Sequence, residues 1–100
     1  MIIDKTDTFA KWLQKLKDRR AKAIIMTYID RMEDGNVGNV ESVGEGVYEK
    51  KINYGPGYRL YFCRLSDIWV LLLCGGDKSS QQKDIDQAKE LKGALKWTNK

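Results

Sequence analysis

Histidine is missing from this chain of 100 residues, and cysteine is scarce, with two residues. The absence of histidine excludes imidazole acid–base catalysis, histidine-based nucleophilic triads and the usual zinc sites. Any proton transfer near neutral pH must therefore use Lys, Arg, Tyr, Asp, Glu or Cys with a shifted pKa. We interpret Cys63 and Cys74 as small apolar strand residues with free thiols. A catalytic thiolate is the weaker alternative, because no histidine is present to activate it.

Long apolar runs are also missing. The run from Ile68 to Cys74 falls far short of the about 18 residues that a membrane-spanning helix requires, and no signal peptide is recognisable. We therefore expect a cytoplasmic protein that makes no membrane contact. The glycine-rich segment 35–46 contains neither a GxGxxG nor a GK[ST] pattern, which argues against a nucleotide-binding loop.

The charge that is present is moderately basic. The chain has 18 Lys and Arg against 14 Asp and Glu, a net charge of +4, and an isoelectric point near 9.1. This excess is compatible with a polyanionic partner such as nucleic acid but does not identify one. The length fits one core, and we expect a single domain over residues 1–100.

Three helices are predicted from apolar spacing and capping residues. The first begins after Thr6 and Asp7, and the second is capped by Asp18 and ends at 34–35. The third begins where Ser79 and Gln82 have the spacing of a capping box.

The strands are predicted from alternation. Segments 47–54, 58–65 and 68–74 form three antiparallel strands, preceded by a short strand at 2–3 and an extended piece at 40–43. The predicted class is α+β, a small antiparallel sheet with two N-terminal helices packed on one face and a C-terminal helix, in the order β-α-α-β-β-β-α.

A loop at Gly55-Pro56-Gly57 sets the expected pairing of the first two long strands. It places Lys51 opposite Tyr61 and Asn53 opposite Arg59. A second turn at Ser66-Asp67 adds the third strand. Alternation then predicts one buried face, including Trp69, Leu71 and Leu73, and one working face. The working face carries Glu49, Lys51, Asn53, Arg59 and Tyr61.

Four blocks of the sequence together resemble a known family. They are YEKKI at 48–52, GPGYRLYF at 55–62, LLCGGDKS at 72–79 and QKDIDQA at 82–88. These blocks look like the signature of the addiction-module killer proteins, HigB-like toxins of the RelE/ParE superfamily, and the resemblance spans roughly residues 5–96. Lys50 departs from the family pattern, which usually has an aliphatic residue at that position.

The resemblance implies a toxin of a type II toxin–antitoxin module with a RelE-like fold. Relatives on the RelE side are mRNA interferases, endoribonucleases that commonly act at the ribosome without a metal or other cofactor. The implied partners are a cognate helix-turn-helix antitoxin, mRNA and the ribosome, with operator DNA as a target of the toxin–antitoxin complex.

The resemblance also ranks the candidate catalytic residues. Arg59 is the first candidate, Lys51 and Lys78 follow as further cations for the phosphate, and Tyr61 and Glu49 come last. Each also has a structural interpretation, since strand lysines are usually solvated and Glu49 with Lys51 is a plausible surface ion pair.

The general acid stays unassigned. Several relatives have Tyr or His near the C-terminus, where this chain has Trp97, which transfers no proton at neutral pH. Two alternatives are therefore kept open. They are a ParE-like inhibitor of DNA gyrase that does not cleave RNA, and a basic RNA-binding module.

Overall fold

The computed structural model describes residues 1–95 as one sheet between two helical layers. In chain order the elements are β1 (Ile2–Lys5), α1 (Asp7–Lys15), α2 (Arg19–Glu33), β2 (Glu41–Gly44), β3 (Val47–Ile52), β4 (Tyr58–Ser66), β5 (Trp69–Gly76), the short 3₁₀ helix η1 (Lys78–Ser80) and α3 (Gln81–Gly93). The predicted α+β class and order are confirmed, with the extended piece at 40–43 appearing as the additional strand β2.

The sheet has five strands in the order β1-β5-β4-β3-β2. Strands β2 to β5 pair antiparallel with their neighbours, whereas β1 pairs parallel with β5. The sheet is therefore mixed, and the expectation of a purely antiparallel sheet was wrong at this edge. The parallel pair arises because the α1–α2 hairpin and β2 to β4 separate β1 from β5 in the sequence.

Two of the three predicted helix starts are confirmed by their caps. The Thr6 hydroxyl accepts a hydrogen bond from the Phe9 amide at 3.0 Å, and the Asp18 carboxylate accepts from the Arg20 and Ala21 amides. These bonds satisfy amides that have no partner within the helix.

The predicted capping box at Ser79 and Gln82 was wrong. The Ser79 amide instead donates to the Asp77 carboxylate at 2.8 Å, and η1 forms before α3 begins at Gln81. Asp77 competes successfully because its short side chain bonds the amide two residues ahead.

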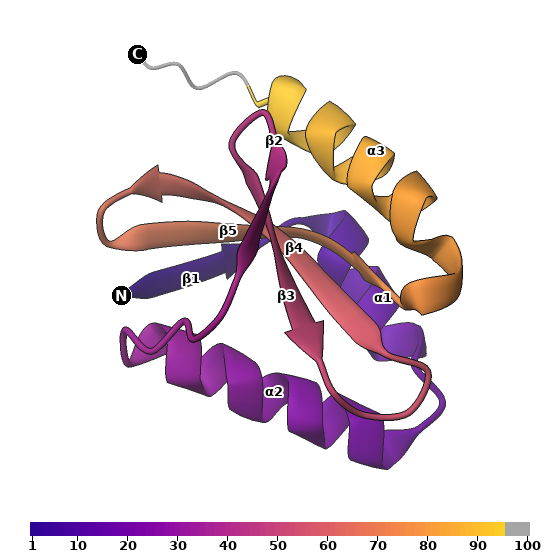
Figure 1. The fold of residues 1–100 in the computed structure, drawn as a ribbon. Coiled ribbons are helices and arrows are strands. Elements are labelled where there is room, and N and C mark those ends of the chain that lie inside the picture. Colours follow the sequence, from indigo (N-terminus) through magenta and orange to yellow (C-terminus); the bar gives the residue numbers. More distant parts are fainter. Residues whose placement is uncertain (96–100) are drawn as a thin grey trace.

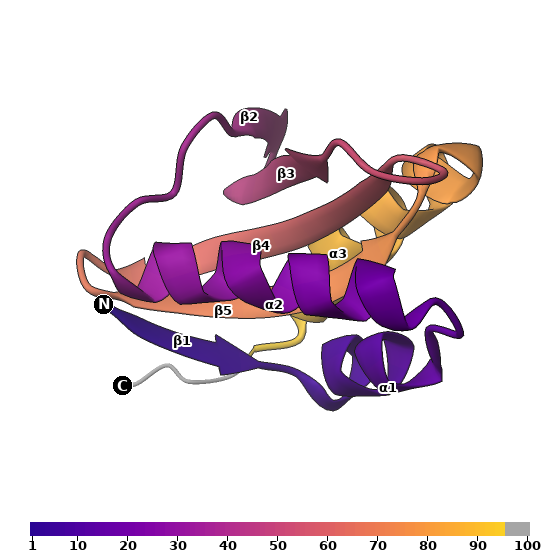
Figure 2. The ribbon, with the colours of Figure 1, turned by 90° about the horizontal axis from the view of Figure 1, so that it is seen from below.

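Each face of the sheet carries its own core. Helices α1 and α2 cover one face and α3 covers the other, as Figures 1 and 2 show together. The first core is apolar and includes Phe9, Ile25, Leu60, Phe62 and Leu72. The second core, under α3, includes Val47, Tyr61, Cys63, Leu73 and Ile85. The face predicted to be open is therefore largely covered, because the apolar residues of α3 pack on it.

The registers of both hairpins differ from the prediction. Lys51 lies opposite Arg59, and Glu49 lies opposite Tyr61. Strand β3 ends at Ile52, two residues earlier than expected, so each of its residues pairs with the β4 residue two positions before the predicted partner. A shift of two residues keeps every side chain on its face, so the faces of β3 and β4 were predicted correctly and the partners were not.

An irregularity between Tyr61 and Phe62 shifts the register with β5, where Phe62 pairs with Leu72. A bulge of this kind changes the side to which later residues point. Before this bulge, Cys63 already pairs with Leu71, one residue off the predicted register, so Leu71 and Leu73 face α3 instead of the first core, and the bulge places Cys74 on that side as well. Trp69 is 37% exposed, and its indole donates to Asp4 at 2.7 Å.

The helices are short relative to a bilayer. Within residues 1–95, none has the length and apolar character needed to cross a membrane.

Candidate functional site

A buried polar cluster joins β3 and β4 to the start of α3. The Tyr61 hydroxyl donates to Glu49 Oε2 at 2.9 Å, and the Gln81 amide donates to the same oxygen at 2.8 Å. The Arg59 Nε lies 3.6 Å from it, with the two side chains 10% and 3% exposed. One carboxylate oxygen of β3 therefore faces two groups from β4 and one from α3.

The Arg59 guanidinium is held on two sides but is not fully satisfied. Its Nη1 donates to the Gly57 carbonyl at 3.2 Å. Its Nε faces Glu49 at ion-pair distance, yet it is the one buried side-chain nitrogen or oxygen of residues 1–95 that makes no hydrogen bond. An unsatisfied buried donor is costly and is often found at functional sites.

Gly57 is the point at which the loop, Arg59 and Lys78 meet. Its φ of +79° is one that glycine adopts readily. A Cβ built there would lie 3.6 Å from Lys78 Cβ and 3.8 Å from Arg59 Nη1. The Gly-Pro-Gly loop thus brings the main chain close to two of the predicted cations.

Asp84 is a second buried carboxylate beneath this cluster. The Ser80 hydroxyl donates to it at 2.5 Å, and it packs so tightly on Gly76 that a Cβ there would collide with it. Because Gly76 lies opposite Arg59 in the sheet, the absence of a side chain lets the start of α3 approach the Arg59 strand.

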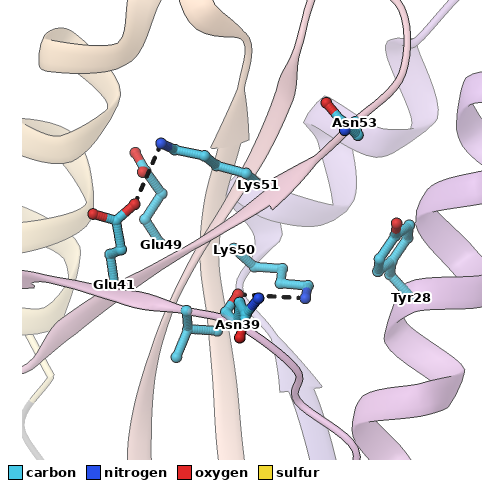
Figure 3. Close-up of a pocket in the computed structure, with 8 residues that line it drawn as sticks. Tyr28, Asn39, Glu41, Glu49, Lys50, Lys51 and Asn53 are labelled. Atoms are coloured by element: carbon cyan, nitrogen blue, oxygen red, sulfur yellow. Dashed lines mark hydrogen bonds and ion pairs between the residues drawn. The ribbon is translucent and has the colours of Figure 1, made fainter.

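Lys51 and Lys78 are the accessible cations. Lys51 forms an ion pair with Glu41 of β2 at 3.3 Å, and both side chains are more than half exposed, at 56% and 69%. Lys78 is exposed at the first position of η1. Figure 3 shows Lys51 beside Glu41 and Glu49 at the edge of β3.

The five predicted residues are thus brought to one region but into different environments. Arg59, Glu49 and Tyr61 are buried and linked, whereas Lys51 and Lys78 lie on the rim. The predicted open cluster of three free cations is not what the structure contains. The catalytic roles stay a prediction, and Trp97 lies outside the described residues.

Sequence reasoning missed Gln81 and Asp84. The signal that pointed to them was the glycine pair at the end of the third long strand, because glycine within a strand often marks a close approach of another element. The partner of that approach, the first turns of α3, depends on tertiary packing.

Burial controls the titration of the groups in this layer. It raises the pKa of the Tyr61 phenol, and the hydrogen bond to Glu49 raises it further. Tyr61 therefore acts here as a neutral donor. Burial also raises the pKa of Cys63 and raises that of Cys74 to about 12. Both thiols are free and buried, which supports their interpretation as apolar strand residues.

The donor chemistry for a metal is sparse in this region. Across residues 1–95, no three or more Cys, Asp or Glu side chains are grouped so that they could hold a metal ion.

Known proteins resemble this chain in sequence and in structure. No family model matches the chain. An uncharacterized protein of Haemophilus influenzae is 52% identical over 89 residues, which cover 89% of this chain and 90% of that protein.

Two of the similar solved structures are E. coli toxin structures. A double mutant of RelE in the free state has a TM-score of 0.65 at 16% identity, covering 89% of this chain and 95% of that one. The RelBE toxin–antitoxin complex has a TM-score of 0.58 at 18% identity, covering 76% of this chain and 94% of that one. The expected RelE-like fold is confirmed, and the HigB-like assignment stays a prediction.

Proposed function

The chain belongs to the same family as the Haemophilus influenzae protein and has the fold of the RelE toxins, and on this premise we propose that it is the toxin of a toxin–antitoxin pair. Its proposed activity is cleavage of mRNA, with the message presented by the ribosome. Its proposed partner is an antitoxin protein that covers the candidate site.

The observation that carries the proposal is the state of Arg59. Its guanidinium forms an ion pair with Glu49 and donates a hydrogen bond to the Gly57 carbonyl, yet the buried Nε makes no hydrogen bond. Guanidinium groups bind phosphate oxygens through several parallel hydrogen bonds. Arg59 therefore offers an oriented donor set in a site largely shielded from water, where its attraction for a phosphate is strengthened.

The surrounding residues suit metal-free cleavage. In this reaction the ribose 2′-oxygen attacks the adjacent phosphorus while the bond to the 5′-oxygen breaks, so one proton leaves the 2′-hydroxyl and another joins the leaving oxygen. Lys51 and Lys78, as rim cations, add positive charge for the pentacovalent phosphate.

Glu49 and Tyr61 take supporting roles in this proposal. Glu49 is 3% exposed and already accepts two hydrogen bonds, so it orients Arg59 and does not take the 2′ proton. Tyr61, with its raised pKa, keeps its proton and holds Glu49 in place. This assignment narrows the catalytic group to Arg59, Lys51 and Lys78.

The direct test is controlled expression in growing bacteria. Wild-type protein should arrest growth and produce truncated messages, and Arg59→Ala should relieve both effects. Because Arg59→Ala leaves Glu49 buried without its cation, Lys78→Met serves as a second variant at an exposed position. Arg64→Ala, at an exposed position of the same strand, is the matched control and should remain toxic.

Two other outcomes would contradict the proposal. Growth arrest with intact messages and blocked DNA supercoiling would identify a gyrase inhibitor instead. Harmless expression of soluble wild-type protein would contradict a toxin altogether.

A further inference from the structure

A pocket of about 330 Å³ opens where the segment that connects α2 to β2 passes β3. Its lining comes from Tyr28 of α2, Asn39 of the connecting segment, Lys50 and Lys51 of β3, and Asn53, which follows β3. Figure 3 shows Lys50 and Tyr28 directed toward each other on one side of β3, with Lys51 on the other side. This volume lies at the lower end of the range for small-ligand sites.

Lys50 is the unusual member of this pocket. The residue is 9% exposed, although it carries a charge. The ammonium donates to the Asn39 carbonyl at 3.4 Å and lies over the Tyr28 ring, whose centroid is 5.3 Å away. No carboxylate of residues 1–95 lies within ion-pair distance of it.

An ammonium that lines a pocket without a counterion favours an anion beside it. An ammonium carries three donors, and one long bond to a carbonyl with one ring contact leaves it poorly satisfied. Burying a charge is costly unless it is paired and hydrogen-bonded. Gly38 leaves room for the ammonium, because a Cβ at that position would lie 2.7 Å from Lys50 Nζ.

The pocket is continuous with the candidate catalytic region. Lys51 and Glu49 line it as well, and the pairing of β2 with β3 begins at Glu41 and Glu49, so β2 leaves β3 uncovered from Lys50 onward. Consecutive strand residues point to opposite faces. Lys50 and Lys51 therefore place one cation on each side of an open strand edge.

We propose that a single strand of RNA crosses the edge of β3 between Lys51 and Lys50 and seats one nucleotide in the Tyr28–Lys50 pocket. Lys50 pairs with the phosphate of that nucleotide, and the Asn39 and Asn53 amides supply the donors and acceptors that base edges require. The proposal rests on the proposed RNA substrate and adds a binding site next to the cleaved phosphate.

The test measures binding without cleavage. A short fluorescent single-stranded RNA with 2′-O-methyl riboses lacks the attacking hydroxyl, so its anisotropy reports affinity alone. Lys50→Met keeps the length and apolar packing of the side chain while removing the charge. We expect affinity to fall about tenfold or more, because a charge-assisted contact is lost.

The salt dependence gives an independent readout. Loss of one phosphate contact should reduce the slope of log affinity against log salt by about 0.7 for a single strand. Lys5→Met, at an exposed position of β1, removes the same charge and should leave both the affinity and the slope nearly unchanged.

A second pair of variants protects the test against misfolding of Lys50→Met. Asn53→Asp adds a negative charge at an exposed position of the pocket and should weaken binding, whereas Gln14→Glu adds the same charge on α1 and should not. The proposal would be overturned if Lys50→Met and Lys5→Met had equal effects on RNA affinity and Asn53→Asp and Gln14→Glu did too. It would also be overturned if the wild type bound no RNA.

The outcome is separable from that of the toxin proposal. Growth arrest with Lys50-independent RNA binding would remove this subsite and leave the toxin standing. Lys50-dependent binding of a hexaglutamate peptide, without Lys50-dependent RNA binding, would assign the pocket to an acidic protein segment and overturn the RNA proposal.

Discussion

Two ion pairs of similar length but different burial give the sharpest test of how the site is held. The Arg59–Glu49 pair measures 3.6 Å with side chains 10% and 3% exposed. The Lys51–Glu41 pair measures 3.3 Å with side chains 56% and 69% exposed. By distance alone, the second pair would contribute more to stability. By burial, the Arg59–Glu49 pair should contribute more to stability.

The perturbation is Glu49→Gln, with Glu41→Gln as the matched change. Glu49→Gln leaves Arg59 buried and charged, because guanidinium does not deprotonate in proteins. Removing one partner of a buried pair costs about 3–5 kcal/mol. The 3.6 Å separation and the carbonyl that Gln retains favour the lower end of that range. Glu41→Gln should cost less than about 1 kcal/mol, since exposed pairs contribute little.

The assay is urea unfolding followed by far-ultraviolet circular dichroism. Domains of this size have about 5–15 kcal/mol of stability, so both variants should remain folded and measurable. The reasoning is refuted if Glu41→Gln destabilises the protein as much as Glu49→Gln does. A Glu49→Gln effect below about 1 kcal/mol would also refute it.

Three further predictions follow from the packing and the charges. Gly76→Ala should destabilise the protein by about 1–3 kcal/mol in urea unfolding, because its Cβ would displace the Asp84 carboxylate, and adding Asp84→Ala should recover part of the loss. The pKa of Cys74 is raised to about 12 in the folded state and is about 8.5 in the unfolded chain. The stability that the neutral thiol contributes is therefore complete below about pH 8.5 and is lost as the pH rises toward 12. Cys74→Ala should flatten the alkaline fall in melting temperature, and an unchanged fall would contradict this. Antitoxin binding should weaken at high salt if Lys51 and Lys78 form its contact surface, and isothermal titration at two salt concentrations checks this, with no salt dependence arguing for an apolar interface.

The elements were predictable from the sequence because their signals are local. Thr6 and Asp18 cap helices through bonds to amides two and three residues ahead, and the Gly-Pro-Gly loop marks a turn by its backbone preferences alone. Strand alternation also sorted Glu49, Lys51 and Arg59 onto one face correctly.

The pairing of strands and the cover on the sheet were not predictable by the same means. The loop closes so that Lys51 pairs with Arg59, and a one-residue shift in the pairing of β4 with β5 changes which residues of β5 face each core. These outcomes depend on contacts between distant segments. The burial of Arg59 follows from them, because α3 closes over the face that alternation alone leaves open.

The most direct test of the account uses purified protein and ribosomes carrying a defined message. The account predicts cleavage by the wild type that leaves 2′,3′-cyclic phosphate ends, and its loss in Arg59→Lys, which retains the charge but not the planar set of donors. An intact message with the wild type, or equal cleavage by Arg59→Lys, would contradict it.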